Sequence, residues 1–323
     1  MVDSISADDR ADLGASLVLL APPKQTKEVV KGRPQIINYE ILLDVKVLVG
    51  DNPAIEKKIL SALLTYAKEQ TIQVTLPGSS VNTLVTEDGE LGGGKFLCPR
   101  SHQSFRLDAF THAVDDVSPL PPNDGDGGSI KLEPWRLAVE EALTHYMGQN
   151  FPHGAVSVFA PCKSKSPYFA IFIESSFQKT RLSGRWRSRW TVTVPGEIGG
   201  ASCKVSGEIR IQTHMFEEGN VQLLSSKTFE FDVEAKSPES LGQDLTKKIT
   251  QCDANYQTAI GRSLDEMSTK SVKALRRQLP MSRDKMDWNK LASYQVGNEL
   301  TRLSCSIGAS AAAAAASSTT STS

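Results

Sequence analysis

Residues 89–96, GELGGGKF, are the first segment whose residue types could do chemistry. Gly89, four further residues, then Gly94 and Lys95 match the start of a phosphate-binding loop, in which backbone N–H groups and the lysine hold phosphates. That motif needs Ser or Thr after the lysine to hold magnesium, but Phe96 occupies the position. No long helix is expected to begin there. The segment therefore predicts a glycine-rich hairpin turn instead of a nucleotide site.

Residues 184–194, GRWRSRWTVTV, place arginines beside two tryptophans, a mixture that can stack on nucleic-acid bases. The spacing is a strict alternation, however. Trp186 and Trp190 share one face of a strand, and Arg185, Arg187 and Arg189 share the other. The pattern favours a sheet strand with buried tryptophans and a charged second face.

Residues typical of catalytic or metal sites show no productive spacing. The histidines have no HExxH-type arrangement, and there is no GxSxG nucleophile motif. The five cysteines form no CxxC pair, so neither a disulfide framework nor a zinc site is indicated. We expect a protein that is not an enzyme and needs no cofactor or metal. The histidines are His102, His112, His145, His153 and His214.

The C-terminal region carries the strongest signal. Residues 270–303 hold eight cations and three anions, a net charge of +5, in a chain whose net charge is −1. Lys273 and Arg277 lie on one helix face, Arg276 flanks them, and Arg283 follows the break at Pro280. Cations near a helix end also favour the helix dipole, so some are expected without any function. A basic patch on an acidic body predicts an acidic partner.

An amphipathic segment follows Pro280. Trp288, Leu291, Val296, Leu300 and Leu303 fall on about half of a helical wheel. A packing helix is one reading. A helix beyond a proline break also fits an arm that binds a partner through its apolar face.

The bulk properties indicate an ordinary soluble globular protein of 323 residues, with 39% hydrophobic and 23% charged residues. The near-neutral total argues against a general nucleic-acid binder. Scattered cysteines fit the reduced cytosol. The first thirty residues lack the pattern of a signal peptide, and no stretch approaches the length of a membrane span.

The periodicity predicts an α+β fold. Residues 1–70 read as an N-terminal helical stalk. Residues 71–235 read as an antiparallel sheet region with an inserted helix near 133–149. Strands are expected at 155–160, 168–174, 186–194, 203–215 and 221–233, which is typical of a meander.

A long helix is predicted over residues 237–279, beginning after Ser237 as cap with Pro238 at its first position. Its apolar residues recur every three or four positions until Pro280. Residues 280–303 form the amphipathic arm, and the composition of residues 304–323 is typical of disorder. A lone meander leaves open edges and this helix exceeds what one small domain needs, so the pattern hints at a dimer.

Several segments resemble the alpha subunits of the F-actin-capping protein family, in the same order along the chain. They are LAPP at 20–23, FLCPR at 96–100, GRWRS at 184–188, EEGNVQL at 217–223, NYQTAI at 255–260, and RRQLP, DWNK and SY within 276–294. The resemblance implies an alpha/beta heterodimer that caps filament barbed ends. It implies a helical stalk, strands that contribute to a sheet shared with the beta subunit, a long helix across that sheet and a C-terminal amphipathic tentacle.

The resemblance also implies where actin would bind. Lys273, Arg277 and Arg283 match the family's basic actin-binding positions, and Arg276 flanks them. We expect Trp288 and Leu291 to anchor the tentacle. The expected partners are the beta subunit and the actin barbed end, in the cytoplasm and cytoskeleton.

Charge alone suggests that the same basic face attracts anionic phosphoinositides. The alternative function is a nucleic-acid-binding module that uses the Arg/Trp strand and the basic helix end. Three features depart from the family pattern: the divergent stretch near residues 24–43, Cys98 where aspartate is common, and the Ala/Ser/Thr tail.

Overall fold

A computed structural model describes 189 of the chain's 323 residues, in two compact units. The described residues are 9, 12–13, 15–16, 53–78, 82–109, 111–120, 127–151, 153–160, 167–178, 182–194, 200–215 and 221–266. The first unit comprises Met1–Gly127 and Ser157–Pro161, and the second comprises Gly128–Val156 and Cys162–Ser323. Each unit is described separately below.

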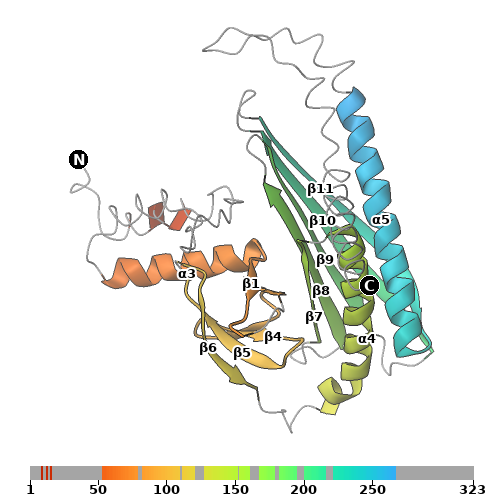
Figure 1. The fold of residues 1–323 in the computed structure, drawn as a ribbon, viewed down its shortest axis with the longest axis horizontal. Coiled ribbons are helices and arrows are strands. Elements are labelled where there is room, and N and C mark those ends of the chain that lie inside the picture. The colour runs from red at the N-terminus through yellow and green to blue at the C-terminus, as the bar shows by residue number, and fades with distance from the viewer. Residues whose placement is uncertain are drawn as a thin grey trace, which may run out of the picture. The chain divides into compact units, whose positions relative to one another are not determined.

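The first unit contains one described long helix and two small antiparallel sheets (Figure 1). Helix α3 spans Pro53–Glu69 and begins with a proline, which the first helical position favours. Strands β1 (Gln73–Thr75) and β2 (Asn82–Leu84) pair with each other. The four-stranded sheet has the order β3-β4-β5-β6, with bounds Glu90–Gly92, Lys95–Cys98, Gln103–Leu107 and Val114–Pro119.

The core of this unit forms where α3 covers the four-stranded sheet. Ile59, Leu63 and Tyr66 from the helix pack in one cluster with Phe96 and Phe105 from the strands. The rings of Phe96 and Phe105 lie 6.0 Å apart. The expected bundle of N-terminal helices and the divergent stretch near residues 24–43 lie largely outside the described residues.

The second unit is built on an antiparallel meander whose sheet has the strand order β11-β10-β9-β8-β7, although only the first two residues of β7 belong to this unit. The strands are β7 (Ala155–Phe159), β8 (Tyr168–Gln178), β9 (Leu182–Thr193), β10 (Ala201–Met215) and β11 (Val221–Ala235). The five strands agree with the alternating patterns in the sequence; β7 ends one residue earlier than predicted, and the other four are two to four residues longer. Each sequential neighbour also pairs in space, which short connections between antiparallel strands favour.

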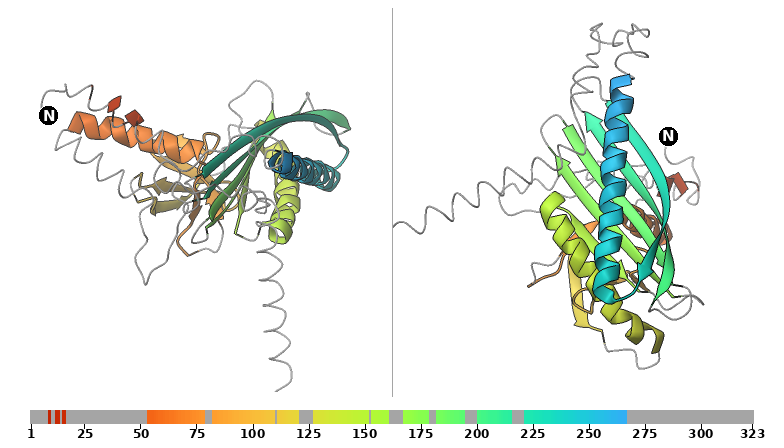
Figure 2. Two further views of the ribbon diagram at one scale, coloured as in Figure 1. Left: turned by 90° about the horizontal axis from the view of Figure 1, so that it is seen from above. Right: turned by 90° about the vertical axis from the view of Figure 1, so that its right-hand side faces the viewer.

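Two helices lie on the same face of this sheet (Figure 2). Helix α4 spans Gly127–Asn150 and helix α5 spans Pro238–Glu266. The sequence predicted a helix near residues 133–149, but α4 begins six residues earlier and holds Pro134 inside. An interior proline removes one backbone hydrogen bond, a cost that a helix buried against a sheet can absorb.

Helix α5 covers 29 residues of the long predicted helix, from Pro238 to Glu266. It begins as expected, because the Ser237 hydroxyl accepts a hydrogen bond from the backbone N–H of Ser240 at 3.2 Å. Residues 267–279 of the predicted helix, the tentacle at 280–303 and the tail lie outside the described residues. The α+β class with antiparallel sheets is confirmed.

Candidate partner-binding surface

The six sequence-predicted contact residues all lie beyond the described residues. They are Lys273, Arg276, Arg277, Arg283, Trp288 and Leu291, and α5 ends at Glu266. What the structure does describe is the support that precedes them along the chain: helix α5, the edge strand β11 and the sheet beneath.

Helix α5 is held against the sheet by an apolar stripe. Leu241, Leu245 and Ile249 are 0% exposed, and Tyr256 and Ile260 continue the stripe toward the C-terminal end. Burying side chains of this size contributes about 1.5–3 kcal/mol each. The stripe from Leu241 to Ile260 therefore holds α5 against the sheet along most of its length.

Polar contacts fix α5 on both sides. The Tyr256 hydroxyl lies 2.7 Å from the Ser225 hydroxyl of β11, and the Tyr146 hydroxyl of α4 donates to Asp253 at 2.5 Å. Burial raises the pKa of Tyr256, although its bond to Ser225 opposes the shift. These contacts tie the helix to the edge strand on one side and to α4 on the other.

The two helices approach closely at Gly242. A Cβ atom at this position would lie 2.7 Å from the backbone oxygen of Ala138 and 3.3 Å from the Ala142 side chain. Only glycine leaves room for this crossing.

The outer edge of β11 is the clearest candidate for partner contact. Fifteen residues of β11 pair with β10, and among the described residues no strand pairs with its other edge. Leu224 on this strand is 66% exposed. A long unpaired edge presents a row of backbone donors and acceptors to another chain.

The alternation predicted for β9 is confirmed. Trp186 and Trp190 are 0% exposed and lie on the face that the helices cover, whereas Arg189 on the other face is exposed. The Trp190 ring crosses Gly207 of β10, where a Cβ atom would lie 2.0 Å from the ring. Buried tryptophans offer no surface on which bases could stack, so this strand gives no support to the nucleic-acid alternative.

Arg185 does not behave as a surface arginine. Its guanidinium donates to Glu174 of β8 at 2.9 Å, and the two side chains are 7% and 3% exposed. A buried ion pair of this kind is sensitive to loss of either partner. The sequence pattern predicted a charged face but did not indicate that one of its pairs is buried.

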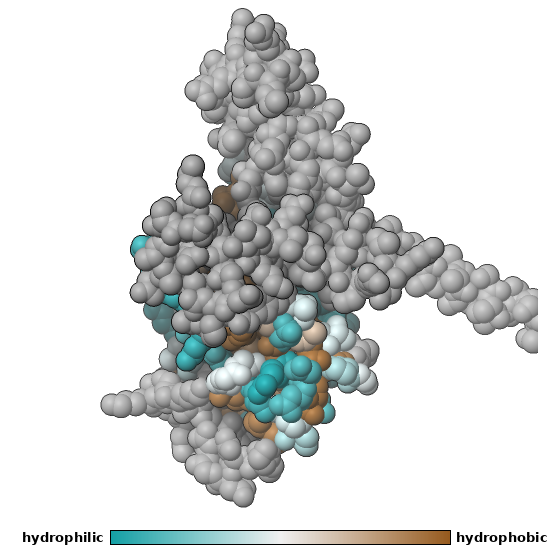
Figure 3. Space-filling model, turned by 90° about the vertical axis from the view of Figure 1, so that its left-hand side faces the viewer, coloured by the Kyte–Doolittle hydropathy of each residue, from teal (hydrophilic) through white to brown (hydrophobic). Residues whose placement is uncertain are grey.

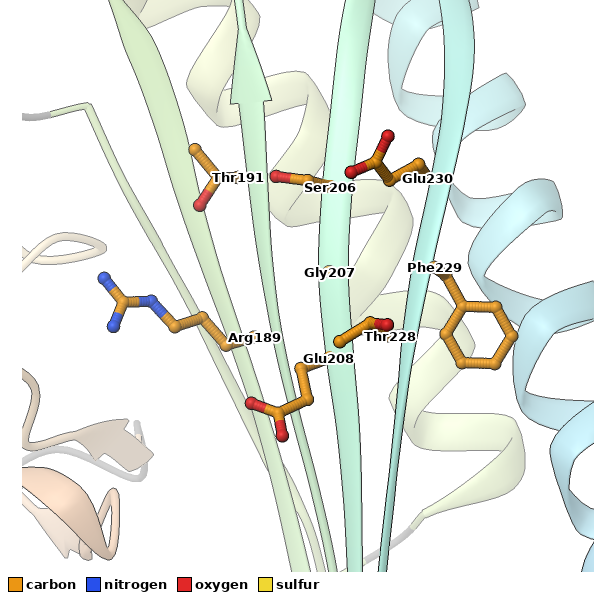
Figure 4. Close-up of a pocket in the computed structure, with 8 residues that line it drawn as sticks. All are labelled: Arg189, Thr191, Ser206, Gly207, Glu208, Thr228, Phe229 and Glu230. Carbon is orange, nitrogen blue, oxygen red and sulfur yellow. The ribbon is translucent and has the colours of Figure 1, made fainter.

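A shallow hollow of about 270 Å³ lies on the polar face of the sheet (Figure 4). Arg189, Glu208 and Glu230 line it, together with hydroxyl side chains, while the Phe229 ring points away toward α5. Both carboxylates already have cationic neighbours, because Glu208 pairs with Arg210 and Glu230 with Lys204. The hollow therefore selects no ligand of either charge.

The glycine-rich segment is the hairpin that was expected. Strands β3 and β4 flank Gly93 and Gly94, which have φ values of 63° and 76°. Lys95 points to Asp116, with Nζ 2.8 Å from Oδ2, and lowers the pKa of that carboxyl. The lysine thus has a structural partner, and no helix begins after it as a phosphate loop would require.

Neither a metal cluster nor a membrane span is found in the described part. No group of three or more His, Cys, Asp or Glu residues there could hold a metal ion. None of its helices is both long enough and apolar enough to cross a membrane. Where Figure 3 colours the surface, hydrophilic and hydrophobic residues are intermingled.

Sequence reasoning also missed a second buried polar pair, which joins α5 to α4. Asp253 and Tyr146 are 1% and 6% exposed and are 107 positions apart. The available signal was an acid on the apolar face of α5, four residues after Ile249 and three before Tyr256.

Comparisons with known proteins agree over nearly the whole chain. A family model described as F-actin capping protein alpha subunit matches residues 15–299. A protein of Caenorhabditis elegans, named F-actin-capping protein subunit alpha, is 32% identical over 303 residues, covering 93% of this chain and 100% of the relative. A Chaetomium thermophilum protein of the same name is 28% identical over 272 residues, covering 84% and 93%.

A solved structure has the same fold. The homodimeric actin capping protein alpha subunit from Plasmodium berghei matches with a TM-score of 0.62 and 18% identity, covering 77% of this chain and 90% of the other.

Proposed function

Because the chain belongs to the F-actin capping protein alpha subunit family, we propose that it is the alpha subunit of a heterodimer that caps actin-filament barbed ends. The observation that carries this proposal is the match to the family model over residues 15–299. The family is one of non-enzymatic actin-binding proteins, so the expectation that the chain is not an enzyme is confirmed. Its place of action would be the cytoplasm, at the cytoskeleton.

The proposed partner is a capping-protein beta subunit, and the proposed contact is the free edge of β11. The length of the strand and the exposure of Leu224 support this choice. Adding a partner strand would satisfy the backbone groups along the edge. Co-expression should yield a stable one-to-one complex, whereas the chain expressed alone should aggregate. A soluble, monomeric alpha chain would contradict the proposed edge contact.

Actin contact is assigned to the residues that follow α5. Lys273, Arg276, Arg277 and Arg283 would meet the acidic barbed end, and Trp288 and Leu291 would anchor the arm. The net charge of +5 over residues 270–303 supports the electrostatic part. The apolar stripe after Pro280 supports the anchoring part.

The free energies of these contacts indicate which residues set the association rate and which set the dissociation rate. A nanomolar cap needs about −12 kcal/mol. Surface ion pairs supply roughly 0–1 kcal/mol each, so four cations cannot hold the cap alone. Each buried large apolar side chain adds about 1.5–3 kcal/mol. The cations should therefore speed association, and the anchors should slow dissociation. The beta subunit's own arm should add avidity through effective concentration.

Arg277→Glu tests this division. Elongation from filament seeds, followed as the complex is added and then diluted, separates the two rates. We expect slower association that depends on salt, and nearly unchanged dissociation. The basic cluster is the set Lys273, Arg276, Arg277 and Arg283. Lys247→Glu is the matched control, because Lys247 is an exposed cation on α5 outside this cluster. An equal effect of both substitutions would mean that total charge matters, and faster dissociation alone would contradict steering.

The basic cluster is also a proposed site for anionic phosphoinositides. The support is its charge alone. Co-sedimentation with phosphoinositide vesicles should weaken when Lys273 and Arg277 are both changed to glutamine. Unchanged sedimentation would remove the proposal.

A further inference from the structure

The carboxyl group of Asp253 is buried, and no cation in the described part of the chain pairs with it. It lies on the inner face of α5 and is 1% exposed. Oδ2 accepts the hydrogen bond from Tyr146 of α4 at 2.5 Å, and Oδ1 has no hydrogen-bond partner among the described residues. Most buried carboxyls are fully bonded or ion-paired, so this arrangement needs an explanation.

The neighbours of this carboxyl are aromatic. The Tyr146 and Phe151 rings are 5.9 Å apart, Phe151 and Trp186 are 6.0 Å apart, and Trp186 and Tyr256 are 6.2 Å apart. The Trp186 Nε1–H also has no hydrogen-bond partner in the described part of the chain. The carboxyl thus lies at the edge of an apolar aromatic cluster that joins α4, β9 and α5.

The titratable and charged groups near this carboxyl are few. Tyr146 faces it from α4, and Cys252 is its neighbour on α5. Burial and Asp253 raise the pKa of the Cys252 thiol, and the cations Lys248 of α5 and Lys227 of β11 oppose that shift. The pKa of Asp253 itself is shifted by burial and by the Tyr146 hydrogen bond, and by no charged neighbour in the described part of the chain. No described cation therefore stabilises its ionised form.

We propose that Asp253 is a proton-dependent latch that holds α5 against α4 and the sheet. The protonated carboxyl fits the apolar site, and its ionisation places an uncompensated charge there, which favours release of the helix. The proposal of a latch does not depend on the proposed function. If the chain is a capping-protein alpha subunit, the latch acts on the helix that precedes the basic cluster.

The direction of the pH effect follows from linkage. Burial raises the pKa of Asp253 from 3.8 to about 7, although the Tyr146 hydrogen bond opposes this shift. Protonation then stabilises the closed helix fully below about pH 4, and this contribution is lost as pH rises to about 7. Between pH 6 and pH 8 the opening equilibrium should increase about tenfold, given these two pKa values.

Hydrogen exchange of peptides from α5 tests the latch. The full chain, purified with its co-expressed partner subunit, is measured at pH 6 and pH 8, and each rate is corrected for the intrinsic pH dependence of exchange. We expect protection about tenfold lower at pH 8. Asp253→Asn should abolish this difference. Asp244→Asn, at an exposed position of the same helix, should retain it.

A second variant keeps the test decisive if Asp253→Asn does not fold. Tyr146→Phe removes the bond that favours the ionised carboxylate, so the loss of protection should move to higher pH. A merely structural role for Tyr146 would instead lower protection equally at both pH values. The latch is overturned by that uniform loss, or by an Asp253→Asn variant that keeps the wild-type pH dependence.

Discussion

Replacing Gly207 with alanine probes the packing that supports the proposed edge strand. The new Cβ would lie 2.0 Å from Cε3 of Trp190, where carbon atoms normally approach to about 3.5–4.0 Å. The ring would have to retreat by about 1.5–2 Å. It has no free space to enter, because Trp190 is 0% exposed and lies 6.0 Å from the Phe229 ring and 5.7 Å from the Phe231 ring.

Three contributions set the size of the effect. Overpacking costs about 1–3 kcal/mol, and disturbing an aromatic pair adds about 0.5–1.5 kcal/mol. The lower chain entropy of unfolded alanine offsets about 0.4–1 kcal/mol. We therefore expect Gly207→Ala to lower the free energy of unfolding by about 0.5–4 kcal/mol.

Denaturant unfolding followed by circular dichroism measures this loss. Ser206→Ala is the control, since Ser206 is exposed on the polar face and should change stability by less than about 0.5 kcal/mol. Repeating Gly207→Ala in a Trp190→Leu background should recover most of the cost, because the ring is gone. The same cost in both backgrounds would refute the account of this contact.

Two further substitutions test the helix crossing and the buried ion pair. Gly242→Ala should destabilise by about 1–3 kcal/mol, because its Cβ would meet a backbone oxygen of α4 at 2.7 Å. Gly261→Ala on the same helix should be neutral or stabilising in the same unfolding assay, since nothing lies within 4 Å of its Cβ, and equal losses at both glycines would argue against the close crossing. Glu174→Gln should cost about 3–5 kcal/mol by removing the carboxylate charge that the buried Arg185 guanidinium contacts. Glu230→Gln, in an exposed pair, should cost less than about 1 kcal/mol, and a similar cost for both would contradict the importance of burial.

The sequence predicted the structure best where residues close together in the chain determine an element and its buried face. Alternation around Trp186 and Trp190 predicted which side of β9 is buried, and Ser237 followed by Pro238 predicted where α5 begins. Local periodicity works here because the same residues set both the element and its buried face.

Features that depend on long-range register could not be predicted. The Trp190 ring meets Gly207 only because β9 and β10 pair in one particular register, and Asp253 meets Tyr146 across 107 positions. The start of α4 was misplaced because Pro134 looks like a first-turn proline, whereas tertiary packing extends the helix past it. The six predicted actin contacts stay predictions.

The most direct test of the proposed function is barbed-end elongation from uncapped filament seeds. The chain is co-expressed with a beta subunit, either intact or truncated before Met281, and the complexes are compared at matched concentration. We predict that the intact complex stops elongation and that the truncated complex remains dimeric but loses most of its capping. Full capping by the truncated complex would contradict the assignment to the arm, and no capping by the intact complex would contradict the proposed function itself.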